Sequence, residues 1–290
     1  MNTQAPRKKR PRKPLSEQGK PGRYDERNTL NDLTGKEWLL LTQSFWTSEP
    51  SADDRPAYEH PAPFMVRDVE KLIRLFTKRG MTVLDPFVGS GTTLLAASRA
   101  GRRSIGIDLN PDYLALAERR LGPPDEGRWK YLVGDAAELV DAAGPVDYVV
   151  TSPPYHNILR NTGNGLRSKT GKQYRMAARD GVEYYTEHEN DLGNCDSYPE
   201  FIRALRSIMA KVRDRLVDGR YCTIIMSDFT VDKREVCVQA DLVVMMTDVG
   251  FEFCGTTVLL QTVKPLFPFG YPFAYKINHH HQNMLTFRKS

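Results

Sequence analysis

A short glycine-containing turn between two apolar segments constrains this chain more than any other feature of its sequence. Residues 83–94 read VLDPFVGSGTTL: an apolar run ends at Asp85, Gly89 and Gly91 follow, and a second apolar segment begins at Leu94. This order predicts a buried strand, a tight loop and the first turn of a helix, an arrangement that brings backbone amides close to a ligand. Glycine permits that approach because it lacks a Cβ atom.

Two common phosphate-binding loops do not fit this turn. A P-loop requires Gly-Lys-Ser/Thr, but Thr92 follows Gly91, and a dinucleotide fingerprint requires a third glycine where this chain has Leu94. Asp85 ends the strand, and a carboxylate inside a phosphate cradle would repel the ligand. A cationic or amine-bearing ligand therefore fits the turn better.

Strand-like and helix-like segments alternate along the chain around this turn. Apolar runs predict seven strands, at residues 83–85, 104–108, 130–134, 146–150, 221–226, 251–262 and 282–288. Helical spacing of apolar residues predicts helices between the earlier strands and again at 197–216 and 236–249. The alternation is typical of a doubly wound, mostly parallel α/β sheet of Rossmann-like type. Right-handed crossovers place the carboxyl ends of such strands along one edge, where ligands bind.

Three aspartates, Asp85, Asp108 and Asp135, fall at or just past the ends of successive predicted strands. One aspartate in such a position is commonly a helix cap. Recurrence on consecutive strands favours a shared site, because the strand ends face one crevice. Carboxylates accept hydrogen bonds from hydroxyl and amino groups, so the crevice suits a ligand rich in those donors.

A second polar turn, TSPPY at Thr151–Tyr155, follows the strand at 146–150. Proline pairs usually stand in loops without chemistry, but this pair ends a strand of the same sheet as the glycine turn. With both turns in view, the chain resembles the S-adenosylmethionine-dependent DNA methyltransferases that modify exocyclic amino groups, N4 of cytosine or N6 of adenine. DPFVGSGTT is similar to their cofactor loop and TSPPY to their catalytic loop. The resemblance runs from about Glu59 to the C-terminus and is loose after Tyr155.

The resemblance implies a class I methyltransferase fold with S-adenosylmethionine as cofactor. It assigns the amino group of the cofactor's methionine part to Asp85, the ribose hydroxyls to Asp108 and the adenine amino group to Asp135. It further implies that the cofactor is bound by His60, Pro61, Pro86, Phe87, Gly89, Ser90, Gly91, Thr92 and Thr93. The serine and the threonines would bind the methionine carboxylate, with helix capping as their alternative role.

The same resemblance makes Ser152, Pro153, Pro154 and Tyr155 the catalytic loop. The Ser152 side chain and the Pro153 carbonyl would accept the hydrogens of the target amine, whose lone pair is otherwise delocalised into the ring. Tyr155 would stack on a base rotated out of the duplex. Serine at the first loop position, rather than Asp or Asn, resembles the cytosine-N4 enzymes more than the adenine-N6 enzymes. The enzymes that methylate cytosine at C5 resemble one another in using a nucleophilic cysteine that follows a proline. No cysteine of this chain follows a proline, so we expect direct, in-line methyl transfer without a covalent intermediate.

A basic segment follows the catalytic turn. Residues 156–175 contain no acidic residue and carry Arg160, Arg167, Lys169, Lys172 and Arg175. We expect a loop inserted at 156–196 that orders on DNA, with a plain solvated loop as the alternative. The aromatic-rich stretch 269–275 and Asn278 are expected to rim the base pocket.

The formal net charge of +5 comes from the N-terminus, where residues 7–13 carry six positive charges and leave −1 for the remainder. We expect a disordered basic tail at 1–28, either attracting phosphates or merely solubilising, and one methyltransferase domain at 29–290. The sequence has neither an apolar run of about 18 residues nor a secretory signal, so we expect a cytoplasmic protein of prokaryotic or phage type. Three adjacent histidines, 279–281, point to alternate faces, and we expect no metal site.

The sequence therefore predicts a site-specific DNA cytosine-N4 methyltransferase of a restriction–modification system. An adenine-N6 DNA methyltransferase is the main alternative, and an RNA amino methyltransferase or a catalytically silent DNA-binding relative stays open. The chain has no separate target-recognition domain of about 100 residues. We expect the loop at 156–194 to read a short site, or recognition to be relaxed or supplied by a second copy or a partner protein.

Overall fold

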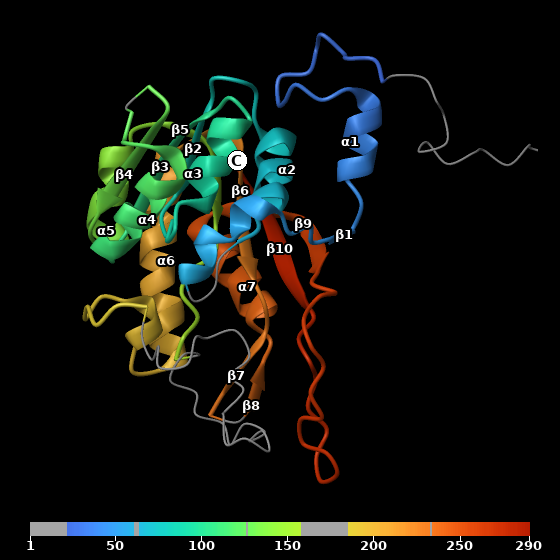
Figure 1. The fold of residues 1–290 in the computed structure, drawn as a ribbon, viewed down its shortest axis with the longest axis vertical. Coiled ribbons are helices and arrows are strands. Elements are labelled where there is room, and N and C mark those ends of the chain that lie inside the picture. Colours follow the sequence, from blue (N-terminus) through green and yellow to red (C-terminus); the bar gives the residue numbers. More distant parts are fainter. Residues whose placement is uncertain (1–21, 61–63, 126, 158–184, 233) are drawn as a thin grey trace, which may run out of the picture.

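The computed structural model describes residues 22–60, 64–125, 127–157, 185–232 and 234–290 (Figure 1). Residues 22–28, which we predicted as tail, already contact the domain: the Tyr24 hydroxyl accepts a hydrogen bond from Lys78 Nζ at 3.1 Å, and Arg23 O accepts one from Gly35 N at 3.1 Å. The rest of the predicted tail and most of the predicted DNA-contacting loop lie outside the described residues.

An eight-stranded sheet forms the centre of the molecule, in the order β1-β9-β10-β6-β5-β2-β3-β4. Its strands are β1 (Phe45–Thr47), β2 (Thr82–Asp85), β3 (Arg103–Asp108), β4 (Trp129–Val133), β5 (Val146–Thr151), β6 (Leu216–Met226), β9 (Phe251–Leu260) and β10 (His281–Lys289). Only β10 runs antiparallel to its neighbours among these strands. A separate two-stranded hairpin consists of β7 (Phe229–Val231) and β8 (Arg234–Val236).

The predicted doubly wound, mostly parallel sheet is confirmed, but the predicted count of seven strands was wrong. The eighth strand is β1, which pairs in parallel with β9 through the register Phe45↔Val258. Its three residues contain one buried side chain, Trp46. A segment this short has no alternation long enough to be recognised in the sequence.

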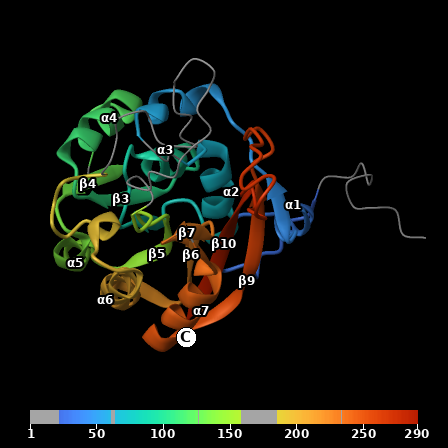
Figure 2. The same ribbon diagram turned by 90° about the horizontal axis from the view of Figure 1, so that it is seen from below.

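Helices cover both faces of the sheet (Figures 1 and 2). They are α1 (Gly35–Leu41), α2 (Val66–Phe76), α3 (Thr92–Arg99), α4 (Pro111–Leu121), α5 (Ala136–Leu139), α6 (Tyr198–Arg215) and α7 (Val238–Val249). Adjacent residues of β2 show the two layers: Val83 packs in the core with α2 and α3, whereas Leu84 packs in the core with α6 and α7. Successive side chains of a strand point to opposite faces, so a strand buried on both sides is apolar throughout.

Helix α6 matches its prediction closely. The Ser197 side chain caps it by accepting a hydrogen bond from Glu200 N at 3.4 Å. Its buried side chains recur at the spacing of one helical face and are Phe201, Leu205, Ile208, Met209 and Val212. Burying each such side chain contributes about 1.5–3 kcal/mol. No helix in the described ranges is both long and apolar enough to cross a membrane.

One edge of the sheet carries the carboxyl ends of its parallel strands. Strands β2, β3 and β5 end there at Asp85, Asp108 and Thr151. Strand β9 is also parallel to β5, because both β9 and β6 pair antiparallel with β10 and β6 is parallel to β5. The chain therefore leaves β9 at this same edge, as a projection of residues 261–280 that returns into β10 (Figure 1). We call residues 261–280 the arm.

Candidate active site

The glycine turn and the TSPPY turn are joined by the buried carboxylate of Asp85. Its Oδ1 accepts hydrogen bonds from Thr151 Oγ1 at 2.6 Å and from Phe87 N at 3.1 Å, and its Oδ2 accepts one from Thr93 Oγ1 at 2.5 Å. Thr151 is the first residue of TSPPY and Thr93 lies in the first turn of α3. The glycine turn and the TSPPY turn are thus neighbours at one edge of the sheet.

Asp85 itself lies beneath the cavity between the turns rather than in its wall. The side chain is 1% exposed, and burial raises the pKa of its carboxyl to about 6. Both oxygens accept hydrogen bonds from the chain, and Asp85 does not line the cavity. A strand-end carboxylate can bind inward to its own loop as readily as outward to a ligand, and the contact of Asp85 with the cofactor's amino group stays a prediction.

The glycine turn is shaped by contacts that tolerate no side chain. Gly89 has φ of 48°, and a Cβ atom there would stand 2.8 Å from His60 Nε2. Gly89 N donates to Asp108 Oδ2 at 2.8 Å, and Gly89 O accepts from the Tyr131 hydroxyl at 3.0 Å. Gly91, with φ of 77°, would bring a Cβ within 2.7 Å of Ala117 Cβ on α4. These contacts fix the turn between the sheet, α4 and His60.

The hydroxyl side chains of the turn do not reach the cavity wall. Arg120 on α4 donates from Nη1 to Ser90 O at 2.7 Å, to Ser90 Oγ at 3.2 Å and to Thr92 Oγ1 at 3.0 Å. Ser90, Thr92 and Thr93 are all buried. Burial lowers the pKa of Arg120 to about 10. The side chains of these three residues bind within the protein in this structure, and their predicted binding of a methionine carboxylate stays a prediction.

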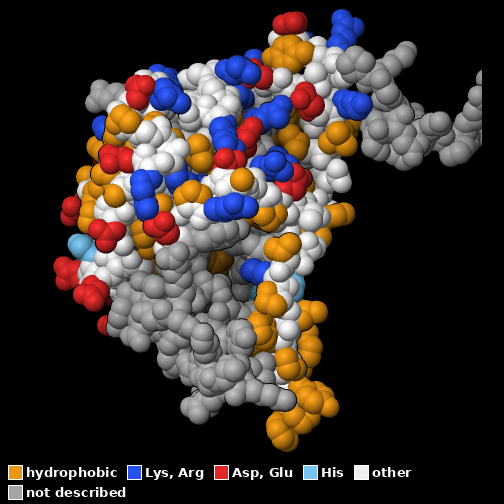
Figure 3. All heavy atoms as spheres, in the orientation of Figure 1, with side chains coloured by type: hydrophobic (Ala, Val, Ile, Leu, Met, Phe, Trp, Pro, Cys, Tyr) orange, Lys and Arg blue, Asp and Glu red, His pale blue; other side chains and the backbone are white. Residues whose placement is uncertain are grey.

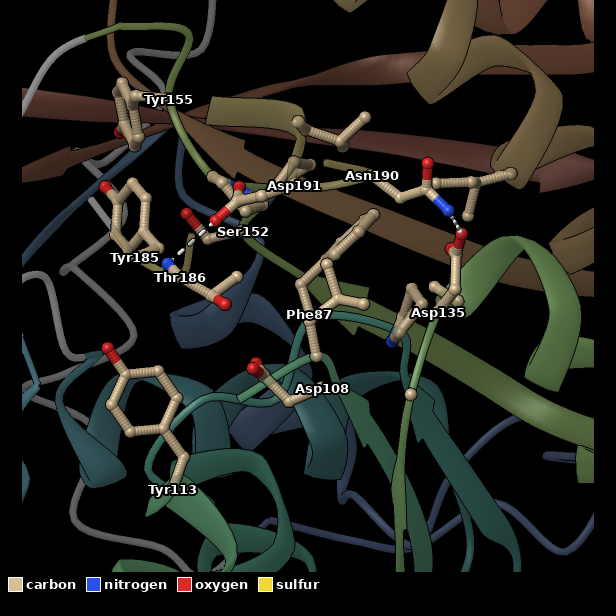
Figure 4. A pocket seen from close by; sticks show the side chains of 18 of the residues that line it. Phe87, Asp108, Tyr113, Asp135, Ser152, Tyr155, Tyr185, Thr186, Asn190 and Asp191 are labelled. Carbon is tan, nitrogen blue, oxygen red and sulfur yellow. Dashed lines mark hydrogen bonds between the residues drawn. The ribbon is translucent and has the colours of Figure 1, made fainter. Parts of the chain in front are cut away.

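A cavity of about 650 Å³, open mouth included, lies above the two turns (Figure 4). Of the predicted site residues, those that line it are His60, Pro86, Phe87, Asp108, Asp135, Ser152, Pro153, Pro154 and Tyr155. Those that do not line it are Asp85, Gly89, Ser90, Gly91, Thr92 and Thr93. Those outside the described residues are Pro61, Arg160, Arg167, Lys169, Lys172 and Arg175.

Carboxylates dominate the charge of this cavity. Asp108, Asp135 and Asp191 line it, and no lysine or arginine of the described residues does. Asp108 accepts from Gly89 N and from Asn110 N at 3.0 Å, and burial raises its pKa to about 6. This charge favours a cationic or donor-rich ligand and disfavours a phosphate, as the sequence predicted for the turn.

Residues 185–194 form a wall of the cavity that the sequence did not reveal. Asn190 Nδ2 donates to Asp135 Oδ2 at 2.9 Å, while Asp135 Oδ1 caps α5 by accepting from Ala137 N at 2.7 Å (Figure 4). Asp191 accepts from Thr186 N at 3.0 Å and from Gly193 N at 2.8 Å. Asn110 Nδ2 donates to Tyr185 O at 3.2 Å. These residues carry no motif, and only folding brings them to the strand ends.

Two aromatic side chains bound the cavity on the side of His60. The His60 ring meets the ring of Tyr113 edge to face, with 4.6 Å between centroids, and the ring of Tyr185 at 6.1 Å. Tyr113 belongs to α4 and was not predicted as a site residue. His60, Tyr113 and Tyr185 thus form an aromatic cluster, and the ring of His60 lies against Gly89.

Tyr155 lines the cavity, and its ring and hydroxyl are fixed by contacts on the side away from the cavity. The side chain is 8% exposed, and its ring lies 5.4 Å from that of Phe229. Its hydroxyl accepts hydrogen bonds from Ser227 N at 2.9 Å and from Gln282 Nε2 at 3.3 Å. Ser227 and Gln282 were missed because they belong to strand ends far from TSPPY in sequence.

Comparisons with known proteins find methyltransferases. Residues 3–119 match a family model described as DNA methylase, and residues 83–166 match one described as methyltransferase domain. Type II methyltransferase M2.DpnII of Streptococcus pneumoniae is 40% identical over 104 residues, which are 36% of this chain and 37% of that protein. Type II methyltransferase M.BglI of Bacillus subtilis is 38% identical over 92 residues, which are 31% of this chain and 26% of that protein.

The chain spans less than two fifths of the length of the curated relatives that it matches. Among solved structures, TrmN from Thermus thermophilus superimposes with a TM-score of 0.49 at 15% identity, covering 82% of this chain and 52% of that one. The methyltransferase-domain match and the sheet topology confirm the predicted fold class, and the match confirms the predicted cofactor, S-adenosylmethionine.

Proposed function

We propose that the chain is an S-adenosylmethionine-dependent DNA amino-methyltransferase and that it methylates DNA at the exocyclic N4 amine of cytosine, which the DNA methylase match at residues 3–119 and the similarity to type II methyltransferases support. One observation carries the proposal. A single carboxylate, Asp85, hydrogen-bonds both to the first residue of TSPPY and to the helix that follows the glycine turn. This contact holds the catalytic turn and the cofactor turn against one cavity.

The residues of the cavity suit the cofactor. Asp108 faces the cavity with a carboxylate that can accept from ribose hydroxyls, and Asp135 offers an acceptor to the adenine amino group. Phe87 and Pro86 add apolar surface between them. The cofactor supplies a sulfonium methyl group that is already activated for in-line transfer. The absence of lysine and arginine from the described part of the cavity wall agrees with a ligand that carries a positive sulfur.

Ser152 and Pro153 orient the target amine. The Ser152 hydroxyl and the Pro153 carbonyl would accept its two hydrogens, which localises the nitrogen lone pair for attack on a methyl carbon. The sulfur of the cofactor would leave as a neutral thioether, and the methylated amine would release one proton to solvent. Tyr155 stacks on the target base, and its ring is kept in place by Ser227, Gln282 and Phe229. A base reaches this site only when rotated out of the duplex.

The choice of cytosine rests on Ser152. A hydroxyl is a weaker acceptor than the carboxylate or amide that an Asp or Asn would offer. It suits the N4 amine of cytosine, which we take to need less activation than the N6 amine of adenine. The basic residues of 158–184 and most of the N-terminal tail lie outside the described residues, and their contacts with DNA stay predictions. A second copy of the chain or a restriction–modification partner likewise stays a prediction. The domain assignment, 29–290 with an insertion at 156–196, is likewise our proposal.

Product analysis tests the function. The protein is incubated with radiolabelled S-adenosylmethionine and with DNA or RNA, and the nucleic acid is digested to nucleosides. We expect label in N4-methylcytosine from DNA. Label in N6-methyladenine alone would contradict the cytosine assignment, and label in RNA alone would contradict the substrate.

A matched pair of serine variants tests the role of the catalytic turn. Ser152→Ala should slow methyl transfer by about 100-fold, because one oriented acceptor is lost from the reacting amine. Cofactor affinity should be unchanged. The control is Ser207→Ala, which removes an exposed hydroxyl from α6 and should leave turnover as it was. Equal turnover of the two variants would exclude Ser152 from the reaction.

A further inference from the structure

The arm, residues 261–280, exposes more apolar side chain than any other segment that the structure describes. Side chains that protrude from it are Val263 at 75% exposure, Leu266 at 75%, Tyr271 at 81%, Phe273 at 94% and Tyr275 at 89%. Figure 3 shows hydrophobic side chains along the arm, with a cluster of them at its end. Monomeric proteins seldom expose a contiguous apolar surface without a binding role for it.

The arm has defined internal structure. Asn278 joins its two sides near the middle, accepting from Phe267 N at 3.0 Å and donating from Nδ2 to Phe267 O at 2.8 Å. At its end the chain turns at Gly270, whose O accepts from Phe273 N at 2.8 Å and from Ala274 N at 2.7 Å. Gly270 has φ of 74°, and a Cβ there would lie 2.2 Å from Ala274 O. The turn therefore requires glycine, and it holds the three most exposed aromatic residues outward.

The base of the arm is attached to the catalytic turn. Gln282, just past the arm in β10, donates to the Tyr155 hydroxyl, and Ser227 Oγ donates to His281 O at 2.9 Å. His279 pairs with Glu235 of the β7–β8 hairpin at 2.7 Å. The arm thus leaves the sheet beside the cavity, at the edge where the strands end. The predicted rim residues 269–275 and Asn278 do not line the cavity itself. They extend beyond it.

The charge of the arm indicates what it contacts. Residues 261–280 contain two lysines, two histidines and no acidic residue. Lys276 is exposed beside Tyr275 near the end of the arm. Aromatic side chains interleaved with positive charge suit a polyanion that offers flat apolar faces, which is the chemistry of stacked bases between phosphates. Ten residues on each side give the arm a reach of at most about 35 Å.

We propose that the arm binds duplex DNA beside the target base and places Tyr271, Phe273 and Tyr275 against the base stack, while Lys276 approaches a phosphate. Apolar side chains that wedge between base steps unstack and bend the duplex. Wedging beside the site would lower the cost of rotating the target base into the cavity. This inference rests on the proposed function, since it takes DNA as the substrate, and it adds a DNA-contacting element among the described residues.

The test compares the double variant Phe273→Ala, Tyr275→Ala with wild type. Both side chains are almost fully exposed, so their loss leaves the core and the cavity intact. We expect the affinity for a short mixed-sequence duplex, measured by fluorescence anisotropy, to fall about tenfold or more. Affinity for S-adenosylmethionine and the melting temperature should be unchanged. The control is Val244→Ala, which removes an exposed apolar side chain of α7, 62% exposed, and should bind duplex like wild type.

Sedimentation and methylation assays on the same proteins separate the outcomes. Wild-type methylation of DNA together with unchanged duplex affinity of the arm variant would overturn the inference and leave the proposed function standing. A wild-type dimer that the arm substitutions convert to monomers, with duplex affinity unchanged, would assign the arm to a second copy of the chain and overturn the inference as well. A wild type that neither binds nor methylates DNA would overturn the proposed function.

Discussion

The hydrogen bond from Thr151 to Asp85 is the contact on which the arrangement of the two turns depends, and Thr151→Val removes it without changing the shape of the side chain. Asp85 is buried, and raising its pKa from 3.8 to about 6 corresponds to about 3 kcal/mol against the ionised form. Each donor to the ionised carboxylate offsets part of that cost. Loss of one such bond, here 2.6 Å long, should destabilise the protein by about 2 kcal/mol.

The pH dependence of that loss follows from the sign of the shift. The raised pKa means that Asp85 supports folding best when protonated, below about pH 4, and that its contribution declines as the pH rises through about 6. Thr151 stabilises the ionised form, so its removal raises the folded pKa further. The difference in the free energy of unfolding between Thr151→Val and wild type should therefore grow from about pH 5 to about pH 8.

Thermal unfolding measures the effect. At about pH 8 the melting temperature of Thr151→Val should lie about 4–8 °C below that of wild type, and at about pH 5 the gap should narrow. Thr286→Val is the matched control, because Thr286 Oγ1 meets another hydroxyl, Thr223 Oγ1 at 3.2 Å, in the same sheet. Its effect should not depend on pH. A Thr151 effect that is absent, or equal at both pH values, would refute the assignment of Asp85 as an ionised link between the turns.

Three further predictions concern the cavity. Gly89→Ala should weaken S-adenosylmethionine binding, measured by calorimetry, because the new Cβ would lie 2.8 Å from His60 Nε2 and because Gly89 has positive φ. Adding His60→Ala removes the clash but not the backbone strain, so it should restore only part of the lost affinity. Tyr155→Phe should cost about 1–3 kcal/mol in denaturant unfolding by leaving Ser227 N unpaired, and slow methyl transfer with cofactor affinity unchanged. For wild type, cofactor affinity should fall as the pH drops through about 6, where Asp108 protonates and accepts ribose hydroxyls less well; Asp108→Asn should bind weakly without that pH dependence.

Much of the fold could be predicted from the sequence because its parallel strands are buried on both faces. Val83, Leu84 and their counterparts on β5 form continuous apolar runs, and such runs separated by helical patterns have few alternative arrangements. The sequence did not predict strand β1, because its position depends on pairing with β9 rather than on a pattern of apolar residues within the strand.

The site was predictable in its location and less so in its contacts. Strand-end aspartates were expected at one edge, and Asp108 and Asp135 do line the cavity. Which way a side chain turns depends on donors that are remote in sequence: Asp85 turns to Thr151, and Thr92 turns to Arg120. No local pattern encodes these pairings. The wall at 185–194 was missed for the same reason, since only the folded chain brings Asn190 to Asp135.

The contact between Asn190 and Asp135 has a consequence for how tightly adenine can be held. Asp135 is not a vacant acceptor: one oxygen caps α5 and the other already receives an amide hydrogen from Asn190. In the proposed binding mode, an incoming amino group would share the Asp135 oxygen with Asn190 or take the place of Asn190. Where it takes that place, one N–H···O bond is exchanged for another of similar strength, which adds little net affinity but disfavours a ring that presents an acceptor instead of the amine. Asp135 would then select the nucleobase, and the other residues of the cavity would contribute most of the binding free energy.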